Sequence, residues 1–214
     1  MTIVVSVAQR KGGVGKTTLA VSIAAEISRQ TGDVGLIDAD SQGSACQWAE
    51  PGNLTFPVYE LAADTRPIAD WVRTVKQIPH KIVVIDCAPN DRALGAVLAV
   101  SNIAVMPCTP SGLDIEATAR TLDIVRRVRA SRKAALRVLL VPNRVDRRTL
   151  EGQQLIDELA SLGEEVGPAI GSRSAFVRAF SSGYAVADFA KGSAADLEIR
   201  SLAQSVMNGA LAHR

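Results

Sequence analysis

The sequence is poor in cysteine, histidine and aromatic residues. Its three cysteines, Cys46, Cys87 and Cys108, are widely spaced and form no CxxC pair, so neither a disulfide framework nor a structural zinc site is expected. With only His80 and His213, a Ser-His-Asp or zinc hydrolase has little support. Because aromatic residues make up 4% of the chain, its apolar content is mostly Ala, Val, Leu and Ile. That composition suits buried parallel strands covered by helices.

Long apolar runs are also missing. No run reaches the roughly 18–20 residues that span a bilayer, and the short run 3–7 leads directly into a glycine-rich loop rather than a signal-peptide cleavage site. A cytoplasmic protein is therefore expected. The formal net charge of +2 argues neither for nor against nucleic acid. Nine of the 24 basic residues, however, lie between Arg126 and Arg148, where Asp146 is the only acid.

The length of 214 residues suits one sizeable α/β domain, and we predict a single domain over residues 1–214. Apolar runs and helical periodicity alternate along the chain. The predicted strands are 3–8, 34–37, 81–85, 103–106, 138–141 and 166–170. The predicted helices are 17–29, 68–77, 93–100, 115–128, 150–162, 174–180 and 195–212, with residues 41–56 mostly loop. This order predicts an α/β fold with a mostly parallel, twisted sheet and helices on both faces.

A glycine-rich loop, KGGVGKTT at residues 11–18, joins the first predicted strand to the first helix. Glycines let successive backbone N–H groups point inward and cradle phosphate oxygens, and the helix N-terminus adds favourable partial charge. Lys16 would bridge the β- and γ-phosphates, Thr17 would bind Mg²⁺, and Thr18 would contact the α-phosphate. Arg10 replaces the first glycine of the common GxxxxGK[ST] pattern. The predicted nucleotide contacts in this P-loop are Gly12, Gly13, Val14, Gly15, Lys16, Thr17 and Thr18.

Three aspartates follow predicted strands. Asp38 and Asp40 end the second strand, and alternate residues of an extended chain share a face, so both carboxylates can point at one ligand. Asp86 ends the apolar run 81–85, as the magnesium-binding carboxylate of a Walker B motif does. The alternatives are a helix N-cap for Asp40 and a strand-end cap for Asp86.

The loop KGGxGKTT resembles the deviant Walker A motif of the ParA/MinD family of P-loop ATPases. This resemblance implies that Lys11 reaches across an ATP-bridged homodimer and neutralises charge on the partner's nucleotide, much as an arginine finger does. A solvated loop lysine is the alternative. IDADSQG at 37–43 resembles the family's DxDPQG segment, with Ser41 in place of proline. The resemblance implies that Asp40 orients the attacking water and that Asp38 helps to hold the magnesium shell.

Further segments resemble ParA-type proteins. Asn143 and Arg144 match a pair that contacts adenine in the family, and an amide can read a base edge, although a polar turn is the alternative. Residues 190–197 resemble the segment before the last helix, where basic residues bind DNA. The resulting DNA candidates are Arg173, Arg178 and Lys191. A second basic cluster comprises Arg126, Arg127, Arg129, Arg132, Lys133 and Arg137. Either set could instead be a solvated face.

The chain resembles short ParA-type partition ATPases such as ParF most closely. The resemblance implies an ATP hydrolase that uses ATP and Mg²⁺, dimerises on ATP, binds nucleoid DNA without sequence preference and takes part in plasmid partition or cargo positioning. The cargo would be a plasmid, a chromosome region or a protein compartment such as a carboxysome. A ParB-like or cargo adaptor protein would stimulate hydrolysis and release. The segment before the loop at residue 11 is too short to form a helix-turn-helix domain, so operator-specific repression is not expected.

Two alternatives remain at this point. One is a MinD-like, membrane-associated regulator of the division site. The final predicted helix argues against it, because only Arg200 and the terminal Arg214 are basic and no aromatic residue is present, so packing on its own domain is favoured. The other is a metabolic or redox P-loop enzyme, for which Cys87 and Cys108 are the only candidate ligands of an iron–sulfur cluster.

Overall fold

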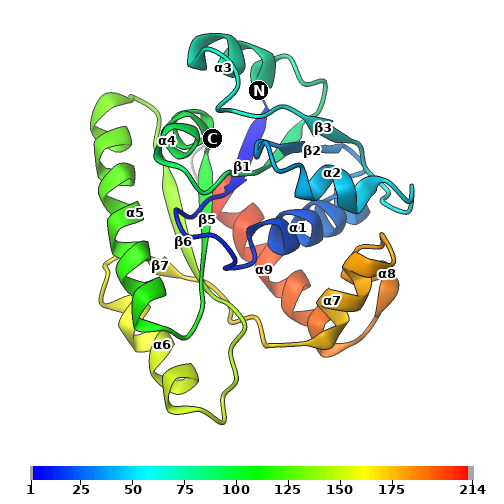
Figure 1. Cartoon of the computed structure of the whole chain (residues 1–214), viewed down its shortest axis with the longest axis vertical. Coiled ribbons are helices and arrows are strands. Elements are labelled where there is room, and N and C mark those ends of the chain that lie inside the picture. Colours follow the sequence, from blue (N-terminus) through cyan, green and yellow to red (C-terminus); the bar gives the residue numbers. More distant parts are fainter. Residues whose placement is uncertain (1, 212–214) are drawn as a thin grey trace.

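The computed structural model describes residues 2–211, in which a parallel β-sheet is covered by helices on both faces (Figure 1). Its strands are β1 (Ile3–Val7), β2 (Val34–Asp38), β3 (Val58–Glu60), β4 (Ile82–Asp86), β5 (Ile103–Cys108), β6 (Arg137–Pro142) and β7 (Glu165–Val166). They lie in the order β3-β2-β4-β1-β5-β6-β7, and every pair is parallel. The predicted fold class is confirmed.

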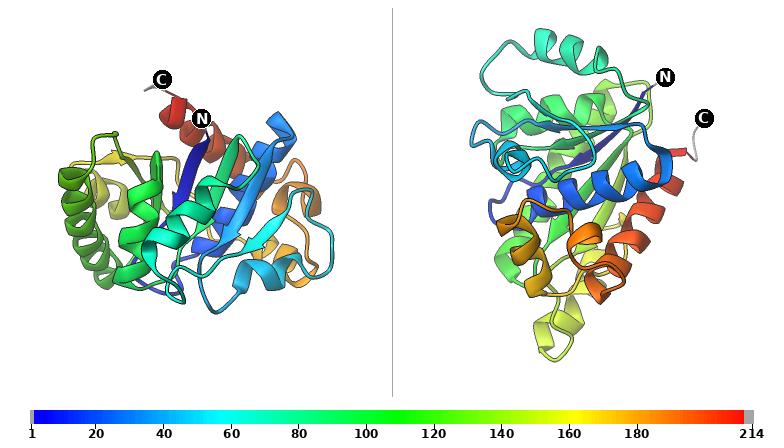
Figure 2. Two further views of the ribbon diagram at one scale, coloured as in Figure 1. Left: turned by 90° about the horizontal axis from the view of Figure 1, so that it is seen from above. Right: turned by 90° about the vertical axis from the view of Figure 1, so that its right-hand side faces the viewer.

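The helices connect these strands and form two layers (Figures 1 and 2). They are α1 (Lys16–Thr31), α2 (Ser44–Ala49), α3 (Ile68–Lys76), α4 (Asp91–Val100), α5 (Gly112–Ser131), α6 (Leu150–Ala160), α7 (Ser174–Ser181), α8 (Val186–Phe189) and α9 (Ala194–Leu211). Helices α1, α2, α7, α8 and α9 contribute to the apolar cluster on one face, whereas α3, α4, α5 and α6 contribute to the cluster on the other.

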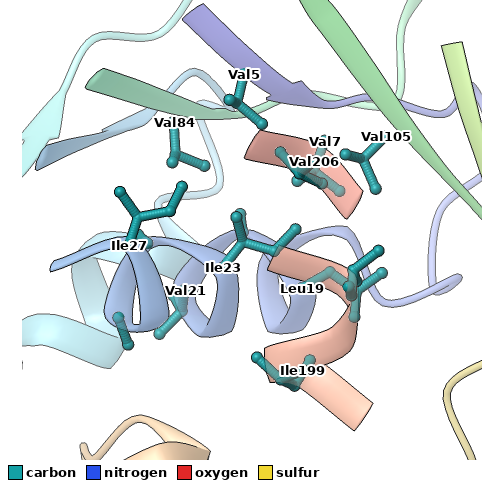
Figure 3. Packing of buried hydrophobic residues seen from close by; sticks show 14 of the residues in the cluster. Val5, Val7, Leu19, Val21, Ile23, Ile27, Val84, Val105, Ile199 and Val206 are labelled. Atoms are coloured by element: carbon teal, nitrogen blue, oxygen red, sulfur yellow. The ribbon is translucent and has the colours of Figure 1, made fainter. Parts of the chain in front are cut away.

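The sheet is apolar on both faces because successive side chains alternate between the two helical layers. In β1, Val5 and Val7 pack on the α1 and α9 side, and Val4 packs on the opposite side. Figure 3 shows Val5 and Val7 facing residues of α1 and α9 that include Ile23 and Val206. Each fully buried side chain of this kind contributes roughly 1.5–3 kcal/mol to folding. The core therefore fixes where the strands end, and the polar loops begin at those ends.

The carboxyl ends of the strands meet at one edge of the sheet. The register pairs Val7 with Asp86 and Asp38 with Asp86, so two of the three predicted carboxylates lie on adjacent strands at the same level. The P-loop leaves this edge after β1. Ligands bind at this edge in open α/β sheets.

Several boundaries differ from the sequence-based predictions. The strand expected at 166–170 is observed only as Glu165–Val166. Gly167 and Ile170 still donate backbone hydrogen bonds to the carbonyl oxygens of Leu140 and Pro142 in β6, but Pro168 between them has no N–H to donate, so the ladder is interrupted. The short elements β3 and α8 were not predicted. The last predicted helix is observed as α9; residue 212, His213 and Arg214 lie outside the described residues.

Candidate nucleotide-binding site

The P-loop curls because two of its glycines have left-handed backbone conformations. Gly13 has φ 78° and Gly15 has φ 95°, values that other residues adopt only with strain. A Cβ atom on Gly15 would lie 2.5 Å from Nδ2 of Asn143. That close approach lets Asn143 donate a hydrogen bond of 2.7 Å to the carbonyl of Val14. The structure therefore uses the amide nitrogen of Asn143 to hold the loop, and the adenine contact of this residue stays a prediction.

Lys16 lies buried inside the curl of the loop. Its Nζ donates to the carbonyl oxygen of Lys11 at 3.0 Å, which closes the loop into a ring. Burial lowers the pKa of Lys16, while the nearby carboxylate of Asp86 acts in the opposite direction. A phosphate placed in this ring would supply the negative charge that a buried ammonium requires.

Thr17 and Asp86 face one another at the start of α1 and the end of β4. The Thr17 hydroxyl donates to Oδ2 of Asp86 at 2.6 Å, whereas Oδ1 of Asp86 is buried without a hydrogen-bond partner. Burial raises the pKa of Asp86 to about 7. A buried carboxylate oxygen without a partner, beside a threonine hydroxyl and the phosphate ring, fits the oxygen ligands and bound waters that Mg²⁺ prefers.

Asp38 and Asp40 have different environments, although they are two residues apart. Asp38 is fully buried, and its Oδ2 accepts hydrogen bonds from the backbone N–H groups of Ala45 and Cys46 at 2.9 and 3.0 Å. Its Oδ1 accepts from the backbone N–H of Asp40 at 3.2 Å. Asp38 thus caps α2 and fixes the acidic loop, and its role in a magnesium shell stays a prediction. Asp40 is half-buried and does not cap α2.

The side chain of Lys11 is partly exposed and lies outside the phosphate ring that its own carbonyl oxygen helps to close. Its Nζ forms an ion pair with the buried carboxylate of Asp114 in the first turn of α5, which also accepts from the hydroxyl of Thr109. Lys11 borders a separate cavity of about 280 Å³ against α5, next to Arg10 and Leu113. Asp114 was not among the predicted site residues. It lies 103 positions from Lys11, and no local pattern links the two.

Two adjoining cavities extend from the P-loop. The phosphate-side cavity, about 430 Å³, is lined by P-loop residues together with Asp40, Trp48, Pro89 and others. The base-side cavity, about 510 Å³, is lined mainly by residues that follow β6 and by α7. Gly15, Thr18, Arg144 and Phe180 line both. Together the cavities form a site with a phosphate end at the P-loop and a larger second end, as a nucleotide requires.

Comparison with known proteins agrees with this geometry. Residues 5–186 match the family described as the CobQ/CobB/MinD/ParA nucleotide binding domain. The chain belongs to this family. It is 37% identical to the maintenance of carboxysome distribution protein A of Gloeobacter kilaueensis over 180 residues, which are 83% of this chain and 77% of that protein. It is 31% identical to the protein of the same name from Halothiobacillus neapolitanus, over 94% of this chain and 95% of that one.

A solved structure shows the same fold. The septum site-determining protein MinD of Pyrococcus horikoshii OT3, complexed with Mg-ADP, superposes with a TM-score of 0.80 over 100% of this chain and 99% of that one, at 15% identity. The likeness places this chain among the P-loop ATPases of the MinD/ParA kind by fold.

Family membership does not show where the basic residues lie, but the structure does. Arg178 and Lys191 are exposed, but the guanidinium of Arg173 makes two hydrogen bonds to Glu198, at 3.0 and 2.6 Å. Arg173 also borders the base-side cavity. The three predicted DNA contacts are therefore not equivalent, because the charge of Arg173 is already balanced within the chain.

The second basic cluster is largely committed to partners within the protein. Arg129 bonds both oxygens of Glu164, and Arg137 pairs with Glu165. Arg132 donates to three backbone carbonyl groups, those of Leu98, Ser101 and Ala135. These three arginines therefore have partners within the chain, and a phosphate-binding role for the cluster stays a prediction. The carboxylates of Glu164 and Glu165 and the carbonyls of Leu98 and Ser101 lie too far along the sequence for the charge run to reveal them as partners.

The last helix and the cysteines bear on the two alternative functions. Ile199, Leu202 and Val206 of α9 are buried in the core, so its apolar face is already covered. Among residues 2–211, no helix is long and apolar enough to cross a membrane. Cys87 and Cys108 are buried, and the same residues contain no group of three or more His, Cys, Asp or Glu side chains placed to hold a metal ion. The covered apolar face of α9 gives no support to a membrane-targeting role for this helix.

Proposed function

We propose that this chain is an ATP hydrolase that dimerises on ATP, binds nucleoid DNA without sequence preference and positions a cargo. The observation that carries the proposal is the place of Lys11. Its carbonyl oxygen helps to close the phosphate ring, whereas its side chain lies outside the ring and borders a separate surface cavity. A lysine in that place can serve the nucleotide of a second subunit once its bond to Asp114 is exchanged.

The residues of the phosphate half have separate tasks in this proposal. Lys16 and the P-loop amides bind the β- and γ-phosphates, and Thr18 lies where the α-phosphate would be. Thr17 and Asp86 would hold Mg²⁺, which neutralises charge on the phosphate oxygens when bound. Asp40 is the half-buried carboxylate of the phosphate-side cavity, and it orients the attacking water. Asp38 keeps Asp40 in place through the bond from its backbone N–H.

A protein compartment is the cargo that we favour. The two relatives described above are named for the distribution of carboxysomes, and one of them is matched over nearly its whole length. A cargo adaptor or ParB-like protein would stimulate hydrolysis and release the dimer from DNA. The protein would then be cytoplasmic and nucleoid-associated, with DNA contacts from Arg178 and Lys191. A plasmid or a chromosome region is the other cargo consistent with this mechanism.

Replacement of Lys11 tests the proposal. In Lys11→Ala and Lys11→Gln, ATP binding should persist through Lys16 and Thr17, whereas ATP-dependent dimerisation and turnover should both fall. Dimers of the unmodified protein should form with ATP and not with ADP, because the γ-phosphate distinguishes the two states. Two variants are needed because loss of Lys11 leaves the buried Asp114 without its cation.

ATP affinity, mass by light scattering and turnover should be measured on the same preparations. Lys133→Ala, which removes an exposed lysine outside the site, is the matched control. Undiminished dimerisation and turnover in both Lys11 variants would overturn the proposed switch. Failure of the unmodified protein to bind ATP would overturn the proposed function as a whole.

A further inference from the structure

Phe180 of α7 lies where the two cavities of the site meet. It lines both of them, as do the P-loop residues Gly15 and Thr18, and 46% of its surface is exposed. A nucleotide with its phosphates in the loop and its base in the base-side cavity must place its sugar at this junction. The exposed ring of Phe180 is therefore available to contact that sugar.

The backbone on the other side of the junction is strained. Arg144, which also lines both cavities, has φ 55°, and among residues 2–211 it is the only non-glycine residue with a positive φ. Non-glycine residues held in this conformation are strained, and they cluster at ligand sites. Arg144 and Phe180 thus mark the junction from two separate parts of the chain.

Phe180 packs against a buried tryptophan rather than standing alone. The rings of Phe180 and Trp48 meet edge to face, with centroids 5.1 Å apart and planes inclined by 81°. Trp48 belongs to α2, and its Nε1 donates to the carbonyl oxygen of Tyr184 at 3.0 Å. Asn53, just after α2, donates to the carbonyl oxygen of Ser182 at 3.1 Å. Figure 1 shows α2 in cyan and α7–α8 in orange on the same side of the molecule.

The contact between these segments is tight and reaches the acidic loop. A Cβ atom on Gly183 would lie 2.5 Å from Pro51, so the two backbones approach closely. At its other end, α2 begins on the carboxylate of Asp38, which also fixes Asp40. Direct contacts therefore run from the acidic loop through α2 and Trp48 to Phe180 and the segment 174–189.

We propose that Phe180 is a positioning residue that covers the sugar of the bound nucleotide, and that the Trp48–Phe180 pair couples occupancy of the site to the segment 174–189. The inference rests on the proposed function only in taking ATP as the ligand. The segment carries Arg178 and is followed by Lys191, so nucleotide binding changes the surface that presents these two charges. The coupling is reciprocal: a partner that binds this segment changes nucleotide affinity by the same factor.

The first test measures affinity for ATP with Mg²⁺ by calorimetry. Phe180→Ala should weaken binding about tenfold, the effect of losing one aromatic contact with a nucleotide, and Phe180→Leu should fall between it and the unmodified protein. The matched control is Phe189→Ala, because Phe189 is a similarly exposed ring on α8 that lines neither cavity. Unchanged affinity in both Phe180 variants would overturn the positioning role.

The second test uses tryptophan emission, since the chain has only Trp48 and Trp71. Trp71 is buried in the opposite apolar cluster. Saturating ATP should change the emission of the unmodified protein, and the change should disappear in Trp48→Phe and be lost or much reduced in Phe180→Ala. A full change in either variant would refute the coupling. If the unmodified protein binds ATP without any change in emission, this inference fails while the proposed function stands.

Discussion

The phosphate half and the base half of the site are built in different ways. The phosphate half comes from residues 11–18 and from aspartates at the ends of β2 and β4 or just beyond them, and its polar groups bond to one another. The base half comes from the end of β6 and from α7. Its polar side chains bond to other parts of the protein, as Asn143 does to the P-loop and Arg173 to α9.

Because the two halves are built differently, we expect them to tolerate substitutions to different degrees. In the phosphate half, a buried charge has few partners, and removing one leaves another uncompensated, which is costly. In the base half, exposed apolar side chains supply contact area, and the loss of one reduces affinity by a limited amount. We therefore expect near-complete losses in the first half and graded losses in the second.

Lys16→Ala should give the largest effect, a loss of ATP affinity of about 100-fold or more, because charge-assisted bonds to the phosphates disappear. Calorimetry with Mg²⁺ present measures it, with Lys133→Ala as the control. An affinity within about threefold of that of the unmodified protein would show that the ring around Lys16 is not the phosphate site. The proposed difference between the phosphate half and the base half would then be wrong.

Substitution of Asp40 should lower ATP turnover while leaving ATP binding almost unchanged. In the unmodified protein, the backbone N–H of Gln42 donates a hydrogen bond of 3.1 Å to a carboxylate oxygen of Asp40. Asp40→Asn retains an oxygen that can accept this bond, so the turn should be preserved. Its turnover should nevertheless fall about 100-fold or more if the carboxylate orients water, while ATP affinity changes little. Asp40→Ala should behave alike, and both should accumulate as ATP-bound dimers. Normal turnover in either variant would remove Asp40 from the mechanism.

A contrast between long buried elements and short exposed ones explains how much of the fold could be predicted from the sequence. Strands such as β1 and β4 are buried on both faces and therefore appear as unbroken apolar runs. The edge strand β3 has three residues, two partly buried and one exposed, and α8 has a single turn, so neither leaves a periodic pattern. The strand observed at Glu165–Val166 is shorter than the one expected at 166–170, because an apolar run does not show that Pro168 interrupts the pairing with β6.

The candidate site divides in the same manner. The P-loop and the three aspartates follow strands within a few residues, so local spacing indicates them. Phe180, Trp48 and Asp114 could not be predicted as site residues, because their roles depend on contacts with residues far away in sequence. The capping role of Asp38 also depends on where the N–H groups of residues 45 and 46 lie in space.

The pKa of Asp86 makes stability depend on pH in the absence of nucleotide and metal. Its ordinary value of 3.8 applies to the unfolded chain, and burial raises the folded value to about 7. Between these values the folded state binds more protons, so the contribution of Asp86 to the unfolding free energy falls as pH rises and is constant above about pH 7.

Urea unfolding in EDTA at pH 5, 6, 7 and 8 measures this effect in the unmodified protein and in Asp86→Asn. The variant should lack this component, so the difference in unfolding free energy between the two proteins should change with pH. Added Mg²⁺ and nucleotide should reduce the dependence, because a cation favours the ionised carboxylate. A difference that stays constant across this range would show that Asp86 is not the buried titrating group.

The smallest expected effects lie beside the base half, where they test whether its charges serve DNA. With ATP and Mg²⁺, Arg178→Gln and Lys191→Gln should each lower the slope of log affinity against log salt for an unrelated duplex by about one. Arg173→Gln should change the slope less, because Glu198 already neutralises Arg173. Arg148→Gln is a matched control, since that exposed arginine pairs with Asp146. If Arg178 and Lys191 leave the slope unchanged while Arg173 lowers it, the ion pair with Glu198 must open on DNA. The base half would then exchange its internal bonds on binding, as Lys11 is proposed to do in the phosphate half.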